Sequence, residues 1–209
     1  MQSILVVNAK GGCGKTTVAT NLASFFAAGG HVTALVDMDE QRSAIEWLAQ
    51  RPDWRPTIVG VKGWETREVE VPANTEWVVI DSPARLHGEM LGKLVRRADR
   101  VVIPVLPSPI DIRAAAHFVG ELMQRGRVRR EDKKVTVIAN RVKEYTLVYE
   151  TLYRFLKSLD IPFTAHLRDT MNYIRAADRG IGIFELAPYL VEQDVEQWRP
   201  LMRWLQRAR

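Results

Sequence analysis

Residues 4–17 read Ile-Leu-Val-Val-Asn-Ala-Lys-Gly-Gly-Cys-Gly-Lys-Thr-Thr, and this stretch decides the fold. An apolar run leads through a glycine-rich turn into a helical pattern, which is the arrangement of a phosphate-binding loop. The ordinary loop has glycine at the position of Ala9. Here the string Lys-Gly-Gly-x-Gly-Lys-Thr takes its place and adds a second lysine, Lys10. The stretch predicts a nucleotide-binding protein.

Each residue type in the loop has a physical role. The three glycines of 11–14 allow a tight turn that aims backbone N–H groups at phosphate oxygens. The helix that begins near Lys15 adds the positive end of its dipole. Lys15 supplies a charge to the β- and γ-phosphates, and the Thr16 hydroxyl is placed to ligate Mg²⁺. The alternative, a glycine-rich turn with surface lysines, explains less of the pattern.

Carboxylates follow two further apolar runs. Asp37 and Asp39 come after the run 32–36, and Asp81 comes after the run 77–80. Because ligands bind at the carboxyl ends of parallel strands, these carboxylates are expected beside the loop. Asp81 fits the residue that holds the Mg²⁺ shell, while Asp37 and Asp39 offer groups for the metal's waters and the attacking water. A helix N-cap is the alternative role for either of that pair.

Alternating apolar runs and amphipathic stretches predict an α/β protein, with a mostly parallel twisted sheet of seven or eight strands and helices on both faces. The 209 residues fit one domain, 1–209. The expected strands are Ser3–Val7, Val32–Val36, Thr57–Val61, Trp77–Ile80, Val101–Leu106, Val135–Ala139 and Pro162–His166. The expected helices are 15–28, 42–50, 88–97, 111–125, 145–158, 170–178 and 189–207.

Composition narrows the class of protein. Hydrophobic content of 46% and charged content of 26% are ordinary for a soluble globular chain, and no apolar run approaches the length of a membrane span. The single cysteine, Cys13, cannot form an internal disulfide, which favours a cytoplasmic location. The net charge of +5 indicates a polyanionic partner or, equally well, a generally basic surface.

The segments 10–17, 37–41 and 78–81 together resemble the ParA/MinD family of P-loop ATPases with a deviant Walker motif. The resemblance spans nearly the whole chain and implies ATP and Mg²⁺ as cofactors. It implies that Lys10 reaches across a nucleotide-sandwich homodimer to the partner's phosphates, and that Asp39 positions the hydrolytic water. Glu40 stands where the family often has proline, with an expected effect on rate or switch geometry only.

The site residues expected from motif and resemblance fall into three groups. The catalytic residues are Lys10, Lys15 and Asp39. The nucleotide-binding residues are Gly11, Gly12, Cys13, Gly14, Lys15, Thr16, Thr17, Asn140, at the family's adenine contact, and the adjacent Arg141. The Mg²⁺ residues are Thr16, Asp37 and Asp81.

The resemblance further implies a positioning ATPase whose ATP-bound dimer binds double-stranded DNA nonspecifically and is nucleoid-associated. An adaptor protein on the cargo is expected to stimulate slow hydrolysis, and the cargo is a plasmid, a chromosome region or a protein compartment such as a carboxysome. Arginines of the C-terminal third are candidates for DNA phosphates, with solvated helix charges as the alternative. They are Arg168, Arg175, Arg203 and Arg207, together with Arg179, Arg199 and Arg209.

Two alternatives remain open from the sequence. A MinD-like membrane ATPase is indicated by the basic, tryptophan-containing tail 195–209, although the spacing of its apolar residues is more typical of core packing. Pro200 is expected to interrupt this helix unless it marks a second helix start. A metabolic enzyme on the same fold is the second alternative. An iron–sulfur relative is excluded because Cys13 is the one cysteine, and the Asn-Lys-x-Asp signature of GTPases is absent.

Overall fold

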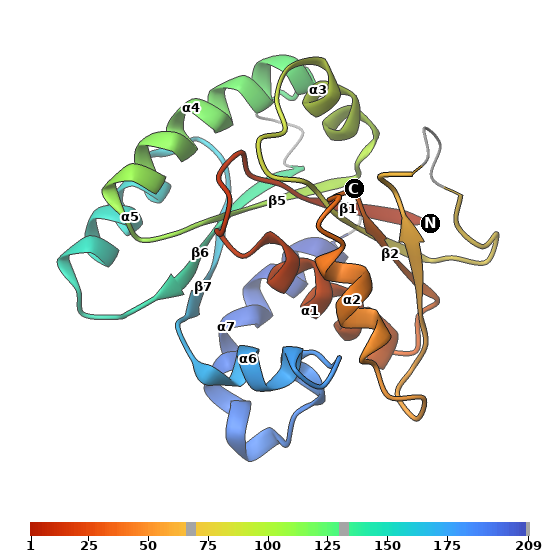
Figure 1. The fold of residues 1–209 in the computed structure, drawn as a ribbon. Coiled ribbons are helices and arrows are strands. Elements are labelled where there is room, and N and C mark those ends of the chain that lie inside the picture. Colours follow the sequence, from red (N-terminus) through yellow and green to blue (C-terminus); the bar gives the residue numbers. More distant parts are fainter. Residues whose placement is uncertain (66–69, 130–133, 208–209) are drawn as a thin grey trace.

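The computed structural model describes residues 1–65, 70–129 and 134–207. Within them, seven strands form one sheet (Figure 1). The strands are β1 (Gln2–Val6), β2 (Thr33–Asp37), β3 (Ile58–Lys62), β4 (Trp77–Asp81), β5 (Arg100–Val105), β6 (Val135–Val142) and β7 (Phe163–Arg168).

The strand order is β3-β2-β4-β1-β5-β6-β7, and every pairing is parallel. The chain leaves β1 toward β2 on one side and later crosses from β4 to β5 on the other. The point where the order reverses therefore lies at β1, where open α/β sheets bind their ligands. Asp81 is in register with Val6 of β1 and with Asp37 of β2, so these three strands end side by side.

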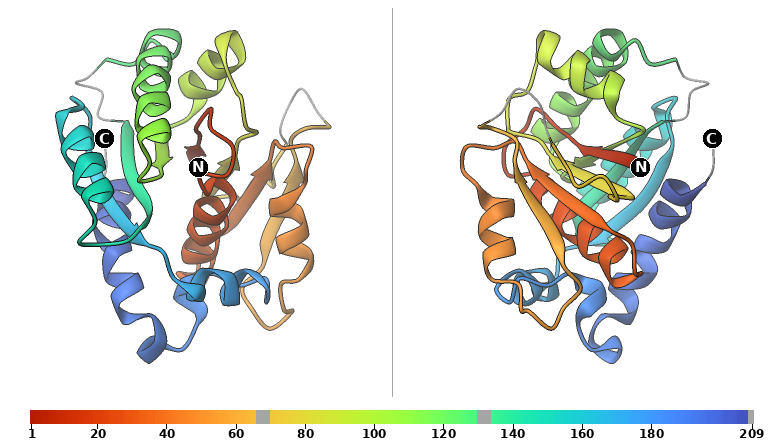
Figure 2. Two further views of the ribbon diagram at one scale, coloured as in Figure 1. Left: turned by 60° about the vertical axis from the view of Figure 1, so that its left-hand side comes forward. Right: turned by 90° about the vertical axis from the view of Figure 1, so that its right-hand side faces the viewer.

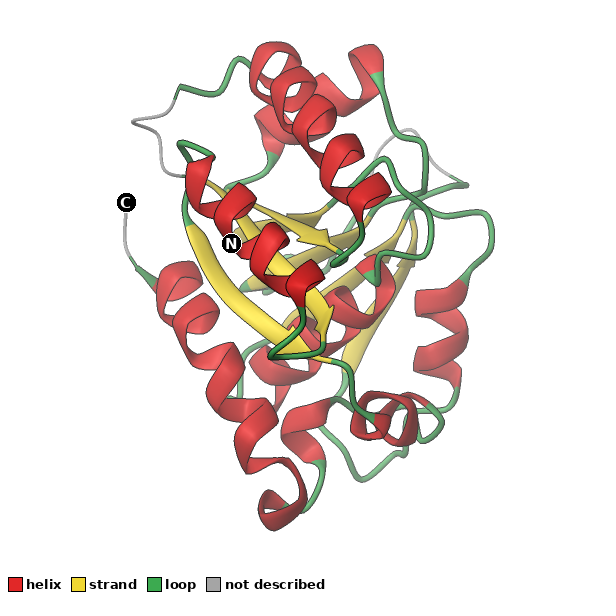
Figure 3. Ribbon diagram, turned by 90° about the vertical axis from the view of Figure 1, so that its left-hand side faces the viewer, coloured by secondary structure: helices red, strands yellow, loops and turns green. Residues whose placement is uncertain are grey.

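Helices cover both faces of the sheet (Figures 2 and 3). They are α1 (Lys15–Ala28), α2 (Ser43–Ala49), α3 (Gly88–Arg97), α4 (Pro109–Gly126), α5 (Leu147–Ser158), α6 (Met171–Ala177) and α7 (Pro188–Gln206), with a short 3-10 turn at Ile183–Glu185. Ile4 packs with α1 and α7, whereas the next residue, Leu5, packs with α3, α4 and α5. Alternate residues of β1 thus enter separate cores, as the pleat of a strand requires.

The predicted elements are all present, most with ends shifted by one or two residues. The prediction for β6 was too short, because the strand continues past Ala139 through a bulge to Val142. α4 begins at Pro109, two residues before the predicted start at residue 111, since Ser108 Oγ accepts a hydrogen bond from the Asp111 N–H at 3.1 Å and caps the helix.

The expected interruption of the last helix at Pro200 is wrong. α7 runs through this proline from Pro188 to Gln206. A proline inside a helix removes one backbone hydrogen bond and crowds the preceding turn. Trp198, Leu201 and Leu205 are buried on either side of it, and their packing holds the helix together.

Candidate nucleotide site

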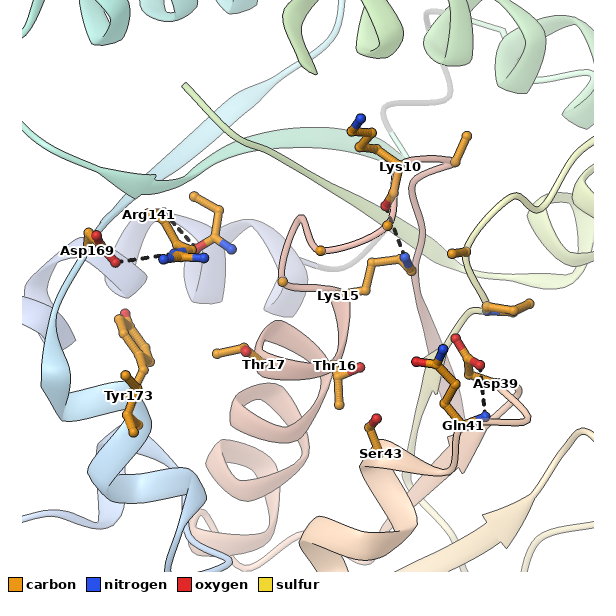
Figure 4. A pocket seen from close by; sticks show the side chains of 18 of the residues that line it. Lys10, Lys15, Thr16, Thr17, Asp39, Gln41, Ser43, Arg141, Asp169 and Tyr173 are labelled. Carbon is orange, nitrogen blue, oxygen red and sulfur yellow. Dashed lines mark hydrogen bonds and ion pairs between the residues drawn. The ribbon is translucent and has the colours of Figure 1, made fainter. Parts of the chain in front are cut away.

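A cavity of about 1110 Å³ lies at the carboxyl edge of the sheet (Figure 4). The loop 9–17 forms its floor, and the segments that follow β2, β4, β6 and β7 form its walls. Its size suits a nucleoside triphosphate, since ligand pockets span roughly 300–1,000 Å³. The glycine-rich loop therefore lines a cavity large enough for the nucleotide that the sequence predicts.

The turn of the loop depends on glycine at two positions. Gly12 and Gly14 have φ of +75° and +89°, in the left-handed region that costs other residues energy. Gly14 is also the residue before α1, and a Cβ built on it would lie 2.2 Å from Asn140 Nδ2. Only glycine fits there, because both the backbone angle and the neighbouring side chain exclude a larger residue.

The two lysines of the loop point in different directions. Lys15 is largely buried, and its Nζ donates a hydrogen bond to the Lys10 carbonyl oxygen at 3.3 Å. The Lys10 side chain is exposed and extends away from Lys15 (Figure 4). Lys15 is thus held in its own cavity, while Lys10 is available to a group outside it.

Cys13 was expected at the nucleotide, but its side chain is buried beneath the loop. Its Sγ lies 3.2 Å from the Lys10 carbonyl oxygen and donates to it. Burial raises the pKa of this thiol, which keeps it protonated. Cys13 contributes its backbone to the loop, and its side chain supports the turn from below.

Asn140 and Arg141 lie in β6 at its second register shift, between Ala139 and Val142, and both line the cavity. Asn140 Nδ2 donates to the Cys13 carbonyl oxygen at 2.8 Å, so this residue braces the loop. Arg141 Nε donates to Asp169 Oδ1 at 3.2 Å and links the ends of β6 and β7. The structure places both beside the expected nucleotide, with Asn140 engaged by the loop.

Asp81 and Asp37 lie beneath the cavity at the ends of β4 and β2. Asp81 is buried and hydrogen-bonded by Thr16, and burial raises the pKa of its carboxyl to about 7. Asp37 is also buried; its Oδ1 accepts from the Asp39 N–H at 3.0 Å, and its Oδ2 accepts from the Ala44 N–H at 2.9 Å. Burial raises the pKa of Asp37 as well. Asp37 therefore anchors the start of α2, the N-cap-like role that was the alternative from sequence.

Asp39 lines the cavity itself. Its Oδ1 accepts a hydrogen bond from the Gln41 N–H at 3.0 Å, which orients the carboxylate (Figure 4). Gln41 and Ser43 lie next to it on the same wall. Asp39 is thus the acidic side chain of the pair 37 and 39 that can reach a bound ligand.

The residues near Thr16 fit a hydrated Mg²⁺. Asp81 Oδ1 is buried and has no hydrogen-bond partner among the described residues, so a nearby cation would compensate it. Across the same residues, no group of three or more His, Cys, Asp or Glu side chains is arranged to hold a metal.

The candidate DNA arginines do not share one face of the chain. Arg168 lines the nucleotide cavity and pairs with the buried Asp194, and it also donates to Gln193 Oε1 at 2.6 Å. Arg175 is exposed on α6, near that cavity. Arg203 and Arg207 are exposed near the end of α7, and Arg209 lies outside the described residues. Arg207 contacts the start of β5 through its carbonyl oxygen, which accepts from Arg100 Nη2 at 2.7 Å.

Sequence reasoning missed one wall of the cavity. Asp169, Thr170, Tyr173 and Ile174 line it from the segment between β7 and α6. Tyr173 OH accepts a hydrogen bond from Trp198 Nε1 at 2.9 Å, which ties this wall to α7. The available signal was their position just after a strand of the parallel sheet, where ligand-binding loops lie.

Comparison with known proteins agrees with this geometry. Residues 4–183 match the CobQ/CobB/MinD/ParA nucleotide binding domain family. The Maintenance of carboxysome distribution protein A of Gloeobacter kilaueensis is 32% identical over 194 residues, covering 87% of this chain and 83% of that protein. Its namesake from Halothiobacillus neapolitanus is 27% identical over 202 residues, covering 88% and 87%.

A plasmid partition protein from Borrelia burgdorferi B31, solved with AMPPNP, has the same fold. Its TM-score is 0.75 at 15% identity, and the alignment covers 97% of this chain and 98% of that one. The family match includes every strand of the sheet and the phosphate-binding loop, and ends before α7. The chain therefore belongs to the CobQ/CobB/MinD/ParA nucleotide binding domain family.

Proposed function

We propose that this protein is a ParA-type positioning ATPase, which hydrolyses ATP to ADP and phosphate and uses the cycle to distribute a cargo. The domain of residues 1–209 would bind ATP in the cavity above the loop 9–17. The observation that carries the proposal is the orientation of Lys10, which is exposed at the rim and extends away from its own Lys15 (Figure 4). A lysine so placed suits the phosphates of a second copy.

The residues of the cavity suit phosphoryl transfer to water. The backbone N–H groups of the loop and the start of α1 receive the phosphates, and Lys15 moves from the Lys10 carbonyl oxygen to the β- and γ-phosphates. Thr16 and Asp81 would hold a Mg²⁺ ion, which would supply further positive charge to the phosphates. Asp39, at the cavity wall, orients the attacking water. Catalysis rests on positioning and charge neutralisation, which dominate phosphoryl transfer.

Dimerisation follows from the same chemistry. If Lys10 neutralises the partner's γ-phosphate, ATP stabilises the homodimer, whereas ADP lacks the group that Lys10 binds. Hydrolysis then requires the dimer and stays slow until an adaptor completes the site. The protein would cycle between an ATP-bound dimer and an ADP-bound monomer.

The similar proteins indicate what kind of cargo this protein would distribute. Both similar proteins carry the description Maintenance of carboxysome distribution protein A, and each aligns over more than four-fifths of both chains. We infer that the cargo is a protein compartment of the carboxysome type, carried by an adaptor protein. The ATP dimer would hold nonspecific double-stranded DNA and lie on the nucleoid in the cytoplasm.

The MinD-like alternative depends on a free amphipathic tail. Trp198, Leu201 and Leu205 of α7 are buried against α1 and the sheet, so the apolar stripe of this helix is already covered. Among the described helices, none has the length and apolar character needed to cross a bilayer. The burial of this stripe favours DNA over a lipid surface as the partner.

The test is retention of the protein on random-sequence duplex DNA with ATP, with ADP and without nucleotide, beside anionic vesicles. Retention on DNA with ATP alone, weakening as salt rises, is the expected result. Retention on vesicles but not DNA would replace the proposal with the membrane alternative. Retention on neither would contradict both and favour a metabolic enzyme.

A further inference from the structure

Four arginines gather where α3 and α4 end. Arg96 and Arg97 form the last turn of α3, Arg125 lies in the last turn of α4, and Arg127 follows that helix. All four are exposed. They are named the arginine cluster below.

The fold holds this cluster together. Arg96 Nη1 donates to the Arg125 carbonyl oxygen at 2.8 Å. Gly92 permits the approach, because a Cβ there would lie 2.7 Å from the same oxygen. A cavity of about 420 Å³ lies between the two helices, and its charged lining residues are Arg96, Arg125, Arg127 and Glu89. Positive side chains therefore outnumber the one carboxylate at this hollow.

Nearby carboxylates are engaged elsewhere. Glu89 pairs with Lys93 at 3.1 Å. Glu121 accepts from the Gly88 N–H at 2.8 Å and from His87, and these hydrogen bonds lower its pKa so that it stays ionised. In the parts of the chain that the structure describes, no carboxylate pairs with Arg97 or Arg127. Arg125 interacts electrostatically with Glu121, so its charge is offset in part, and the other arginines of the cluster supply most of its positive charge.

The cluster lies at the amino edge of the sheet, away from the nucleotide cavity. Just after α3, Asp99 Oδ2 accepts from the Ser3 N–H of β1 at 2.9 Å. The next residue, Arg100, contacts the Arg207 carbonyl oxygen at the end of α7. Figure 2 shows the ends of α4 and α7 on the same side of the molecule. Arg203 and Arg207 are exposed near that end of α7.

The surroundings of the cluster indicate its ligand. Among the described residues of α3 and α4, the exposed large apolar side chains are Met90 and Ile110, both in the amino-terminal turns, whereas the arginines lie at the carboxyl ends. A membrane or an apolar peptide would need apolar anchors beside the arginines. Guanidinium groups suit phosphate diesters, which they bind through paired N–H donors.

We propose that the arginine cluster binds the phosphate backbone of duplex DNA. The inference rests on the proposed function and gives it a DNA surface at the ends of α3 and α4. Because the cluster lies opposite the nucleotide cavity, a second copy docked at the cavity leaves it open.

The test compares two triple variants that each remove three positive charges. The cluster variant carries Arg97→Gln, Arg125→Gln and Arg127→Asn, with Arg96 kept because it joins the helices. Asparagine suits position 127, whose φ of +52° is left-handed. The matched control carries Lys62→Gln, Arg154→Gln and Lys157→Gln at exposed positions. Thermal unfolding and nucleotide affinity, measured on both, verify folding.

Binding to random-sequence duplex DNA is measured with ATP over a range of salt. The cluster variant is expected to bind about tenfold or more weakly, with a salt slope smaller by about 2–3, while the control stays near wild type. Equal binding by the two variants would overturn the inference and leave the proposed function intact. No ATP-dependent DNA binding by the wild type would overturn both. Cluster-dependent binding to anionic vesicles without DNA binding would overturn the inference in favour of a lipid surface.

Discussion

Asn140 Nδ2 lies 2.8 Å from the carbonyl oxygen of Cys13, which is 127 residues away in the sequence, and donates a hydrogen bond to it. Both residues are buried. The end of β6 therefore braces the phosphate-binding loop from the side. Because the loop must hold its N–H groups toward phosphate, this contact is expected to matter for nucleotide binding.

Asn140→Ala should weaken nucleotide binding and lower the free energy of unfolding by about 1–3 kcal/mol, since the Cys13 carbonyl loses its buried partner. Asn74→Ala, at an exposed position, is the control and should change neither. Titration with a fluorescent nucleotide and thermal unfolding measure the two effects. Unchanged affinity in Asn140→Ala would show that the loop holds its shape without the brace.

Lys10→Ala and Lys15→Ala should separate the role of Lys10 in dimerisation from the role of Lys15 in nucleotide binding. Lys10 is exposed and extends away from the cavity, so its removal should spare nucleotide affinity but abolish ATP-dependent dimerisation and stimulated hydrolysis. Lys15 lies in the cavity, so its removal should weaken nucleotide binding itself. Light scattering with ATP and with ADP reports the dimer. Normal turnover by Lys10→Ala would refute a lysine acting in the partner's site.

Asp39→Ala should bind ATP, dimerise and then hydrolyse slowly, because the cavity loses the carboxylate that orients water. A loss of about two to four powers of ten in rate is the range for a group of this kind. Glu40→Ala removes the neighbouring exposed carboxylate and should hydrolyse at close to the wild-type rate. Phosphate release from the preformed ATP dimer distinguishes them, and fast release by Asp39→Ala would contradict its role.

Asp81 predicts a pH dependence of the metal-free protein. Burial raises its pKa from 3.8 to about 7, so between these values the folded state binds more protons than the unfolded state. The free energy of unfolding should therefore fall as pH rises from about 4 to about 7, by up to about 1.4 kcal/mol per pH unit. Thermal unfolding in a chelator at several pH values measures the slope.

Asp81→Asn provides the comparison for that slope. Asp37 also has a raised pKa and contributes with the same sign, so the difference between variant and wild type isolates Asp81. The variant should have a flatter pH profile and gain less stability from Mg²⁺ with nucleotide. An identical slope in the two proteins would mean that Asp81 does not titrate in this range.

Trp198→Ala should destabilise the protein by about 3–5 kcal/mol, because a fully buried indole and its hydrogen bond to Tyr173 are lost. Tyr189→Ala, on an exposed part of the same helix, should be near neutral. Chemical unfolding measures both. A near-neutral Trp198→Ala would show that α7 is not part of the core and would restore the membrane-anchor alternative.

Much of the fold could be predicted because its signals are local. The mostly apolar run at β2 predicts a strand covered by helices on both faces. In the structure every residue of β2, Thr33–Asp37, is buried. The prediction at Pro200 was wrong because it considered only the local effect of proline on a helix. The buried residues around Pro200 pack in the core with residues of α1 and the sheet, and this packing keeps α7 continuous. Propensity is a weak prior when tertiary packing opposes it.

The sequence by itself determined the phosphate-binding loop, the second lysine and the placing of carboxylates at strand ends, because each is a short pattern whose chemistry depends on neighbours in the chain. Only the tertiary structure decided that Asn140 braces the loop, that Asp37 anchors α2 while Asp39 faces the ligand, and that Arg168 pairs with Asp194 inside the protein. Those contacts join distant segments or depend on side-chain direction. They follow from the strand order β3-β2-β4-β1-β5-β6-β7, which hydrophobic periodicity does not encode.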